Sequence, residues 1–302
     1  MSGPFAPVGI FAYRRPRHVA RVLTSLRANP ELEQSPIRVF LDGARGSTDA
    51  EDVARTRAVV RELVPRHAQI VEREVNAGLA NSIIAGVTQL TQEYGRAIVL
   101  EDDLLPSRHF LRYMNDALTL YAQDDRVISV HGYCYPVTGE LPETFFLRGA
   151  DCWGWATWKR GWDVFEADGR KLLHTLEERH LTREFDFDGS YPYTQMLRDC
   201  IAGKVDSWAI RWHASAFLGG KLTLYPGSSQ VQNIGADGSG VHVGATEVFE
   251  HADWGRRLQI GPIPVEESKT ARRMFATYLS GMRPSIGARV LRRLRRLLSG
   301  TA

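Results

Sequence analysis

Three adjacent carboxylates, Glu101, Asp102 and Asp103, follow directly on the apolar run AIVL at 97–100. Carboxylates clustered at the end of a buried strand repel one another unless a cation or hydrogen-bond donors offset their charge. Hard oxygen ligands suit Mn²⁺ or Mg²⁺, which keep some waters and commonly take phosphate oxygens as further ligands. The triplet therefore indicates a divalent cation site, and an exposed acidic turn or a helix cap is the alternative.

The triplet ends the last of four apolar runs in the first hundred residues, and polar residues follow the other three as well. The four runs lie at 8–13, 37–41, 69–75 and 97–100. The polar groups after the first three are Arg14 with Arg15, Asp42 with Gly43, and Asn76 with Gly78. In open parallel sheets, ligands bind beyond the carboxyl ends of the strands, so these groups should share one crevice. A crevice that holds both arginines and carboxylates suits a phosphorylated ligand bridged by a cation.

The segments between the runs predict the elements that position these groups. Apolar residues recur at three- and four-residue spacing in 18–26, 52–64 and 78–90, which is typical of amphipathic helices. Strands that alternate with helices predict an α/β fold with a mostly parallel, Rossmann-like sheet flanked by helices. The first unit of the chain, 1–105, is therefore expected to hold the crevice for the phosphorylated ligand.

The rest of the chain continues this fold without a linker or an internal repeat. A helical pattern at 106–123 is followed by the tryptophan-rich DCWGWATWKRGWDVFE at 151–166, so 106–250 should continue the same domain and cover the crevice. From 251 to 302 the sequence becomes helical and basic. Five arginines gather in its last segment, IGARVLRRLRRLLSG, beside an apolar stripe. This tail is predicted either to lie on an anionic membrane surface or to dock on the body.

The composition narrows the cellular setting. The chain has 302 residues, a net charge of +3 and three cysteines without metal-type or redox-type spacing, which argues for a reducing compartment and against a disulfide framework. The N-terminus lacks a signal-peptide pattern, and no segment is apolar enough to span a bilayer. The sequence predicts a cytoplasmic protein, or one peripheral on the inner face of a membrane. Nucleic acid is not an expected partner, because aromatic residues do not interleave with the arginines.

Five motifs, in this order, resemble the nucleotide-sugar glycosyltransferases of the GT-A fold. They are VFLDG, VLEDDL, CWGWATWKRGW, KVDSWAIRW and NIGADGSGVH. Within that fold the chain is most similar to the inverting branch with bacterial family 2 transferases and N-acetylglucosaminyltransferases that carry a Glu-Asp-Asp motif. The resemblance covers about residues 7 to 250. It implies that 1–105 is the nucleotide-sugar-binding half of one GT-A domain and that 106–250 is its acceptor-binding half.

The resemblance implies a role for the residues around the crevice. Asp103 would be the direct metal ligand, and Glu101 and Asp102 would lie near the ribose and the donor sugar. Asp42 would hold the nucleoside, although an Asp-Gly pair is also an ordinary turn. The remaining donor-binding candidates are Tyr13, Arg14, Arg15, Asn76, Trp153, Gly154 and Trp155. Guanidinium groups suit the diphosphate, and packing is the alternative role for the tryptophans.

Inverting transfer also needs a base that takes the proton of the acceptor hydroxyl. The resemblance favours Asp206, because a related acid stands before a tryptophan in the acetylglucosaminyltransferases, but theirs is one of a pair of acids and here Val205 precedes it. Other candidates are Asp186, Asp188 and Asp199. His242, in the glycine-rich GSGVHVG, is implied as a second metal-side group.

The predicted function is transfer of a sugar, hexosyl or N-acetylhexosaminyl, from a nucleotide diphosphate donor to a glycan or lipid-linked acceptor. UDP-sugars are the expected donors, and bacterial cell-surface polysaccharide or glycolipid synthesis is the expected setting. A sugar nucleotidyltransferase is one rival, although GIFAYRRPR lacks the glycine-rich phosphate loop that it would ordinarily need. A non-catalytic glycan-binding or membrane-docking protein is the other.

Overall fold

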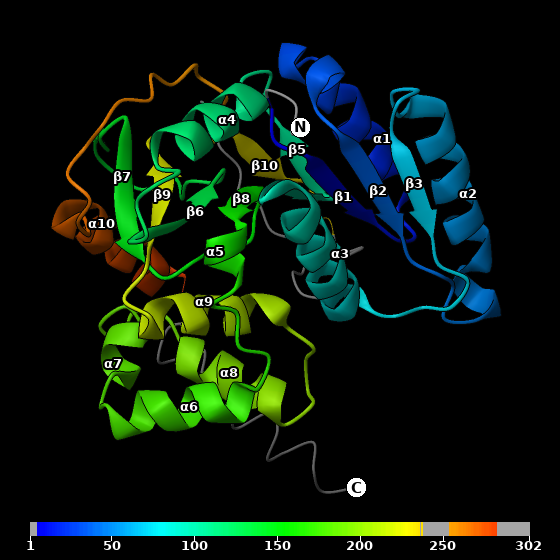
Figure 1. Cartoon of the computed structure of the whole chain (residues 1–302). Coiled ribbons are helices and arrows are strands. Elements are labelled where there is room, and N and C mark those ends of the chain that lie inside the picture. The colour runs from blue at the N-terminus through cyan, green and yellow to red at the C-terminus, as the bar shows by residue number, and fades with distance from the viewer. Residues whose placement is uncertain (1–4, 236, 238–253, 283–302) are drawn as a thin grey trace, which may run out of the picture.

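The structure is a computed structural model that describes residues 5–235, 237 and 254–282. Its centre is an eight-stranded sheet in the order β3-β2-β1-β4-β8-β6-β9-β7 (Figure 1). The strands are β1 (Val8–Ala12), β2 (Ile37–Leu41), β3 (Gln69–Glu72), β4 (Arg96–Glu101), β6 (Val127–His131), β7 (Thr144–Arg148), β8 (Trp155–Trp158) and β9 (Leu222–Pro226). The four strands β3, β2, β1 and β4 run parallel, as predicted.

Strands β8 and β7 run against their neighbours, whereas β6 and β9 are parallel to each other. Because β8 is antiparallel to both β4 and β6, the carboxyl ends of β4 and β6 lie at the same edge of the sheet. A second, two-stranded sheet pairs β5 (Leu104–Pro106) with β10 (Val231–Asn233) directly after the acidic triplet. This pairing explains why the helical pattern expected from residue 106 begins only at Phe110.

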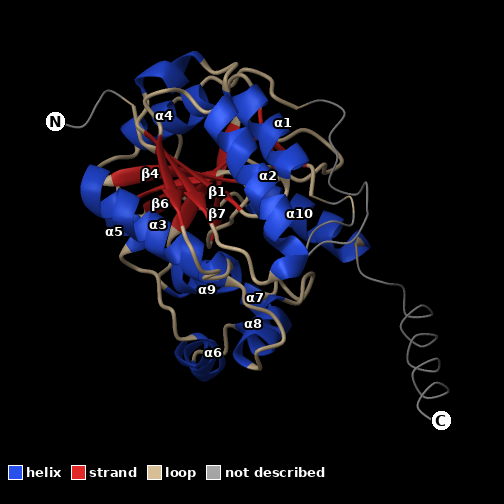
Figure 2. Cartoon of the chain, turned by 90° about the vertical axis from the view of Figure 1, so that its right-hand side faces the viewer, coloured by secondary structure: helices blue, strands red, loops and turns tan. Residues whose placement is uncertain are grey.

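Helices cover both faces of the sheet (Figure 2). They are α1 (Pro16–Leu26), α2 (Ser47–Leu63), α3 (Leu79–Tyr94), α4 (Phe110–Leu120), α5 (Lys159–Trp162), α6 (Gly169–Glu178), α7 (Thr182–Phe185), α8 (Tyr193–Ile201), α9 (Trp208–Leu218) and α10 (Lys269–Gly281), with a 3-10 turn at Pro30–Gln34. The predicted α/β class is therefore confirmed.

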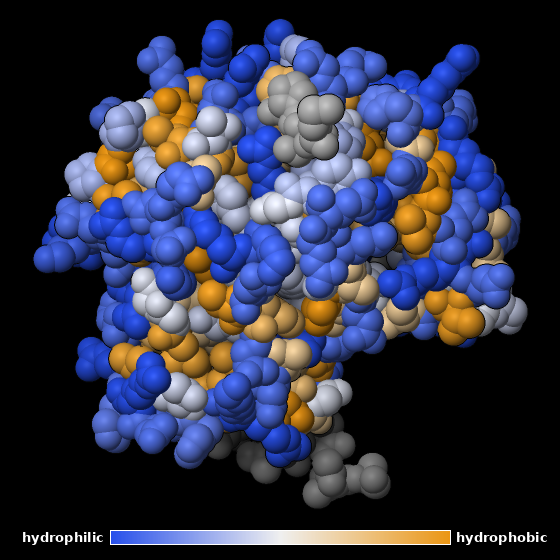
Figure 3. Space-filling view, viewed as in Figure 1, coloured by the Kyte–Doolittle hydropathy of each residue, from blue (hydrophilic) through white to orange (hydrophobic). Residues whose placement is uncertain are grey.

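Side chains alternate across the strands and so build two cores. Val8 and Ile10 of β1 pack with α1, α2 and α4 on one face, whereas Phe11 packs with α3, α5 and α9 on the other. Helices α6 to α9 form a further layer below the second face (Figure 1). The face drawn in Figure 3 is mainly hydrophilic, with apolar residues in small groups. Within the described part of the chain, no helix is long and apolar enough to cross a membrane.

Four tryptophans form the centre of the second core. Trp155 is fully buried and lies 5.4 Å from Trp208, 5.7 Å from Trp162 and 5.8 Å from Trp212, measured between ring centroids. We expect Trp155→Ala to lower the free energy of unfolding by about 3–5 kcal/mol, because it leaves a cavity among the other rings. Urea denaturation followed by circular dichroism measures this, with the half-buried Trp153→Ala as the control. Equal losses from the two variants would contradict the assignment of Trp155 to the core.

Candidate active site

The polar groups that follow strands β1, β2, β3 and β4 meet at one edge of the sheet. The registers Phe11↔Glu101, Ala12↔Leu41 and Leu41↔Glu72 align the carboxyl ends of these strands. The arginines, the Asp42 turn and the acidic triplet therefore share an edge, as the sequence predicts for a parallel sheet.

Asp42 is buried and holds a turn rather than projecting from the edge. Its Oδ1 accepts hydrogen bonds from the amides of Gly43 at 3.0 Å and Ala77 at 2.8 Å, and its Oδ2 accepts one from Gly78 at 3.0 Å. Asn76 completes the turn, because its Nδ2 donates to the Gly43 carbonyl at 2.8 Å. Both predicted residues are thus joined in one structure at the start of α3, whose first turn they position.

Arg15 lies between two carboxylates of the triplet. Its Nη1 donates to Asp103 Oδ2 at 2.6 Å and lies 3.7 Å from Asp102 Oδ1. Asp102 is buried and its Oδ2 accepts a hydrogen bond from the Tyr13 amide at 3.2 Å. No hydrogen bond to the Glu101 carboxylate is found within the described residues. One guanidinium therefore faces three acids.

The three carboxylates of the triplet carry more negative charge than the single Arg15 guanidinium can balance, and their pKa values reflect this. Burial, together with the Asp103 carboxylate, raises the pKa of Asp102 to about 7, and the Arg15 charge opposes this. Burial and the two neighbouring acids also raise the pKa of Glu101 well above its usual value. A divalent cation would relieve this repulsion, so the donor set fits one in charge and in ligand type. No group of three His, Cys, Asp or Glu ligands converges within 5–235, 237 and 254–282, so such an ion would need further oxygens from water or from a ligand.

Residues after β10 close on the triplet from the other side. The Ile234 amide donates to the Asp103 carbonyl at 2.8 Å, and a Cβ on Gly235 would lie 2.3 Å from Asp103 Oδ2. His18 Nε2 contacts the Ile234 carbonyl at 3.1 Å. The sequence analysis includes Gly235 in the motif NIGADGSGVH but gives no role to Gly235 or His18.

A second arginine group lies beside Tyr13. The Tyr13 hydroxyl donates to Asp49 and accepts from the Arg45 amide at 3.3 Å, while the Arg45 and Arg14 guanidiniums lie 5.7 and 5.9 Å from the Tyr13 ring centroid. Arg45 Nε also donates to Asn76 Oδ1 at 3.3 Å. The sequence analysis did not single out Arg45, although it follows the Asp-Gly turn by two residues. Three arginines therefore stand at the candidate site.

The other candidates divide by location. Asp206 precedes α9, its side chain is 64% exposed, and it pairs with Arg211 at 3.2 Å. Within the described residues this pair does not join Asp206 to the triplet, and its role stays a prediction. Trp155 is a core residue, so its ring is out of reach of a donor at the surface. Gly154 has a φ of +62° and a Cβ there would lie 2.7 Å from Val231 Cγ1, which gives it a structural reason to be glycine. His242 and the arginine-rich segment lie outside the described residues.

Comparisons with known proteins give only distant likenesses. No family model and no curated protein matches the chain. Among solved structures, it is similar to the mannosyltransferase PcManGT from Pyrobaculum calidifontis in complex with GDP-Man and Mn²⁺, with 15% identity over 44% of this chain and 37% of that one and a TM-score of 0.29. It is also similar to residues 1–349 of TarS from S. aureus, with 10% identity over 50% of this chain and 47% of that one and a TM-score of 0.33. The match spans less than half the length of either of these two proteins.

Proposed function

We propose that the chain is a metal-dependent, inverting glycosyltransferase of the GT-A fold. It would move a sugar from a nucleotide diphosphate donor, expected to be a UDP-sugar, to a hydroxyl of a glycan or lipid-linked acceptor. The observation that carries this proposal is the position of Arg15 between Asp102 and Asp103 at the carboxyl edge of the sheet. A site with both charges in contact can bind a diphosphate through its cations and a metal ion through its acids.

In this proposal the arginines at the carboxyl edge of the sheet bind the phosphates and Asp103 binds the metal ion. Arg14, Arg15 and Arg45 offer guanidinium forks to the phosphate oxygens. Asp103 would hold Mn²⁺ or Mg²⁺, which when bound would neutralise negative charge that develops on the leaving diphosphate. The turn held by Asp42 keeps Asn76 within reach of Arg45, so it fixes one side of the phosphate-binding arginines.

Asp206 remains the proposed base for the acceptor hydroxyl, whose proton its carboxylate would take. Its exposure leaves the carboxylate accessible, and its ion-pair partner is Arg211 at 3.2 Å. Synthesis of a bacterial surface polysaccharide or glycolipid, with the basic tail on an anionic membrane, completes the proposal. The membrane part of the proposal rests on the arginines and the apolar stripe in the sequence of the tail.

Titration calorimetry of UDP- and GDP-sugars, with and without Mn²⁺, tests the proposal. We expect at least one donor to bind in a manner that requires the metal ion, and NMR of the product to show an inverted anomeric configuration. Release of pyrophosphate would indicate a nucleotidyltransferase instead. Binding of no nucleotide sugar under either condition would contradict the proposal and favour a non-catalytic protein.

A further inference from the structure

Asp151, which the sequence analysis did not single out, lies in the β7–β8 connection close to the acidic triplet. Strand β8 starts at Trp155, which pairs with Val99 of β4, so the residues just before β8 run alongside the end of β4. The Asp151 side chain is 25% exposed and therefore within reach of a ligand.

His131 faces Asp151 and lacks hydrogen bonds. This histidine ends β6, is fully buried, and has no hydrogen-bond partner on either ring nitrogen within the described residues. Its Nε2 lies 3.7 Å from Asp151 Oδ2, which is longer than a direct hydrogen bond. Burial lowers the pKa of His131, so the ring is neutral and has one donor and one acceptor to satisfy. A buried polar group of this kind requires a partner.

Three tyrosines lie near Asp151. The Tyr193 ring lies 4.6 Å from the His213 ring, measured between centroids, and His213 Nδ1 contacts the carbonyl of Ala150, the residue before Asp151, at 2.7 Å. Tyr191 and Tyr193 lie 4.7 Å apart, and Tyr225 lies 5.0 Å from His131, measured between ring centroids. Burial, and after it the charge of Asp151, raises the pKa of Tyr191, Tyr193 and Tyr225, so their hydroxyls stay protonated and able to donate hydrogen bonds. Aromatic faces beside hydroxyls and a carboxylate are the groups that bind a polyhydroxylated ring.

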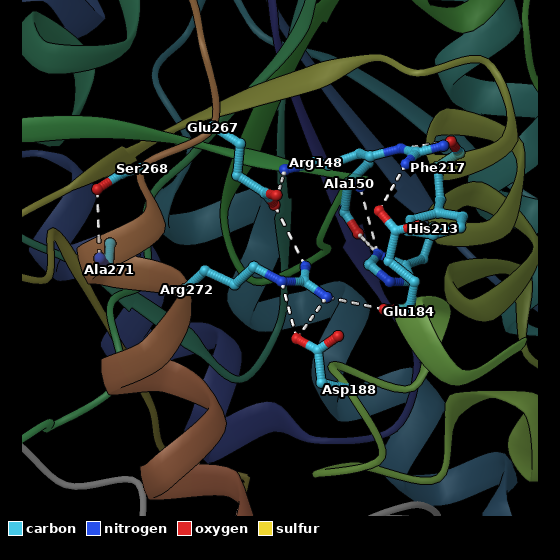
Figure 4. A network of polar contacts seen from close by, with 10 residues as sticks. All are labelled: Arg148, Ala150, Glu184, Asp188, His213, Phe217, Glu267, Ser268, Ala271 and Arg272. Atoms are coloured by element: carbon cyan, nitrogen blue, oxygen red, sulfur yellow. Dashed lines mark hydrogen bonds and ion pairs between the residues drawn. The ribbon is translucent and has the colours of Figure 1, made fainter. Parts of the chain in front are cut away.

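An ionic network holds the turn that carries Tyr191 and Tyr193 (Figure 4). Arg272 of α10 donates to Asp188 Oδ2 at 3.2 Å, to Glu267 Oε1 at 3.3 Å and to the Glu184 carbonyl at 2.9 Å. The turn needs this support, because Phe187 and Asp188 have φ values of +51° and +57°, which disfavour non-glycine residues. A strained turn fixed by α10 indicates that the position of the tyrosines matters.

We propose that Asp151, His131 and the tyrosines at 191, 193 and 225 form the binding site for the acceptor sugar, with Asp151 accepting a hydrogen bond from one of its hydroxyls. This inference rests on the proposed function, because only a glycosyltransferase has an acceptor sugar. The five residues themselves suit any neutral ring that carries several hydroxyl groups. The carboxyl edge of the sheet, where arginines lie beside the acidic triplet, suits the phosphates of the donor. The Asp151 site, which has one carboxylate and several hydroxyl donors, suits a neutral sugar.

The test is saturation-transfer NMR with methyl glycosides of glucose, galactose, mannose and N-acetylglucosamine, on the full chain in the presence of UDP and Mn²⁺. We expect at least one glycoside to bind the wild type, and Asp151→Asn to weaken that binding by about ten- to a hundred-fold, because it replaces a charged acceptor with a neutral amide oxygen. Asp163→Asn is the matched control, since Asp163 is a half-exposed carboxylate paired with Lys159 away from this cluster.

Tyr191→Phe is the second variant, because it removes one hydroxyl, keeps the ring and leaves Asp151 in place. It should weaken the binding of the same glycoside while leaving circular dichroism unchanged. Undiminished glycoside binding by both variants, or no glycoside binding by the wild type, would overturn the inference. Glycoside binding that depends on Asp151 in a chain that binds no nucleotide sugar would support the site and reject the transferase proposal, so the two failures are distinguishable.

Discussion

Asp103→Asn should weaken the binding of a nucleotide diphosphate sugar in the presence of Mn²⁺ by about a hundred-fold. The Asp103 carboxylate is the proposed metal ligand, and the loss of one charge-assisted contact of up to about 3 kcal/mol corresponds to that factor. Titration calorimetry with and without Mn²⁺ measures the change for the donor that binds the wild type best. The variant should retain its fold, because asparagine has nearly the same shape and the Asp103 side chain is partly exposed, at 20%.

The control for this experiment is Asp125→Asn, which removes an equal charge from a carboxylate that is 85% exposed and 3.6 Å from Arg160. It should bind the donor as the wild type does. The ion pair with Arg15 gives the experiment a second possible result. If Arg15 alone recognised the diphosphate, Asp103→Asn would free its guanidinium and strengthen donor binding without metal. Such a gain would contradict the role of Asp103 as metal ligand.

The sequence predicts the parallel half of the sheet well because its signals are local. Each strand is an apolar run followed by polar residues, and each helix repeats apolar residues at helical spacing. The convergence of the arginines and acids on one edge then follows from topology alone. The half after residue 105 is harder to predict, because β5 has three residues and its partner β10 lies more than a hundred residues further along the chain.

The partners of the site residues could not be predicted for the same reason. The contact between Arg15 and Asp103 joins residues 88 positions apart, and the amides bound by Asp42 belong in part to residues 35 and 36 positions away. Asp151 was not selected from the sequence, because it lies in the segment 151–166, whose most distinctive residues are its tryptophans. Its importance depends on His131 and on the turn at 187–193, which only the folded chain brings together.

Asp42→Ala should lower the free energy of unfolding by about 3 kcal/mol and also weaken donor binding. The substitution leaves the amides of Gly43, Ala77 and Gly78 without their acceptor, and each orphaned buried donor costs about 1–3 kcal/mol, less where water can enter. The turn also positions Asn76, which contacts Arg45, so its loss should loosen one of the proposed phosphate-binding arginines.

Urea denaturation and donor calorimetry on the same preparation separate these two effects. Asp42→Asn is the matched variant: it keeps one acceptor oxygen and places an amide donor against a backbone N–H, so its stability should lie between those of Asp42→Ala and the wild type. If Asp42 contacted the nucleoside without supporting the turn, both variants would lose donor affinity at unchanged stability. A loss of stability that parallels the loss of affinity across the two variants would instead show that Asp42 acts through the turn.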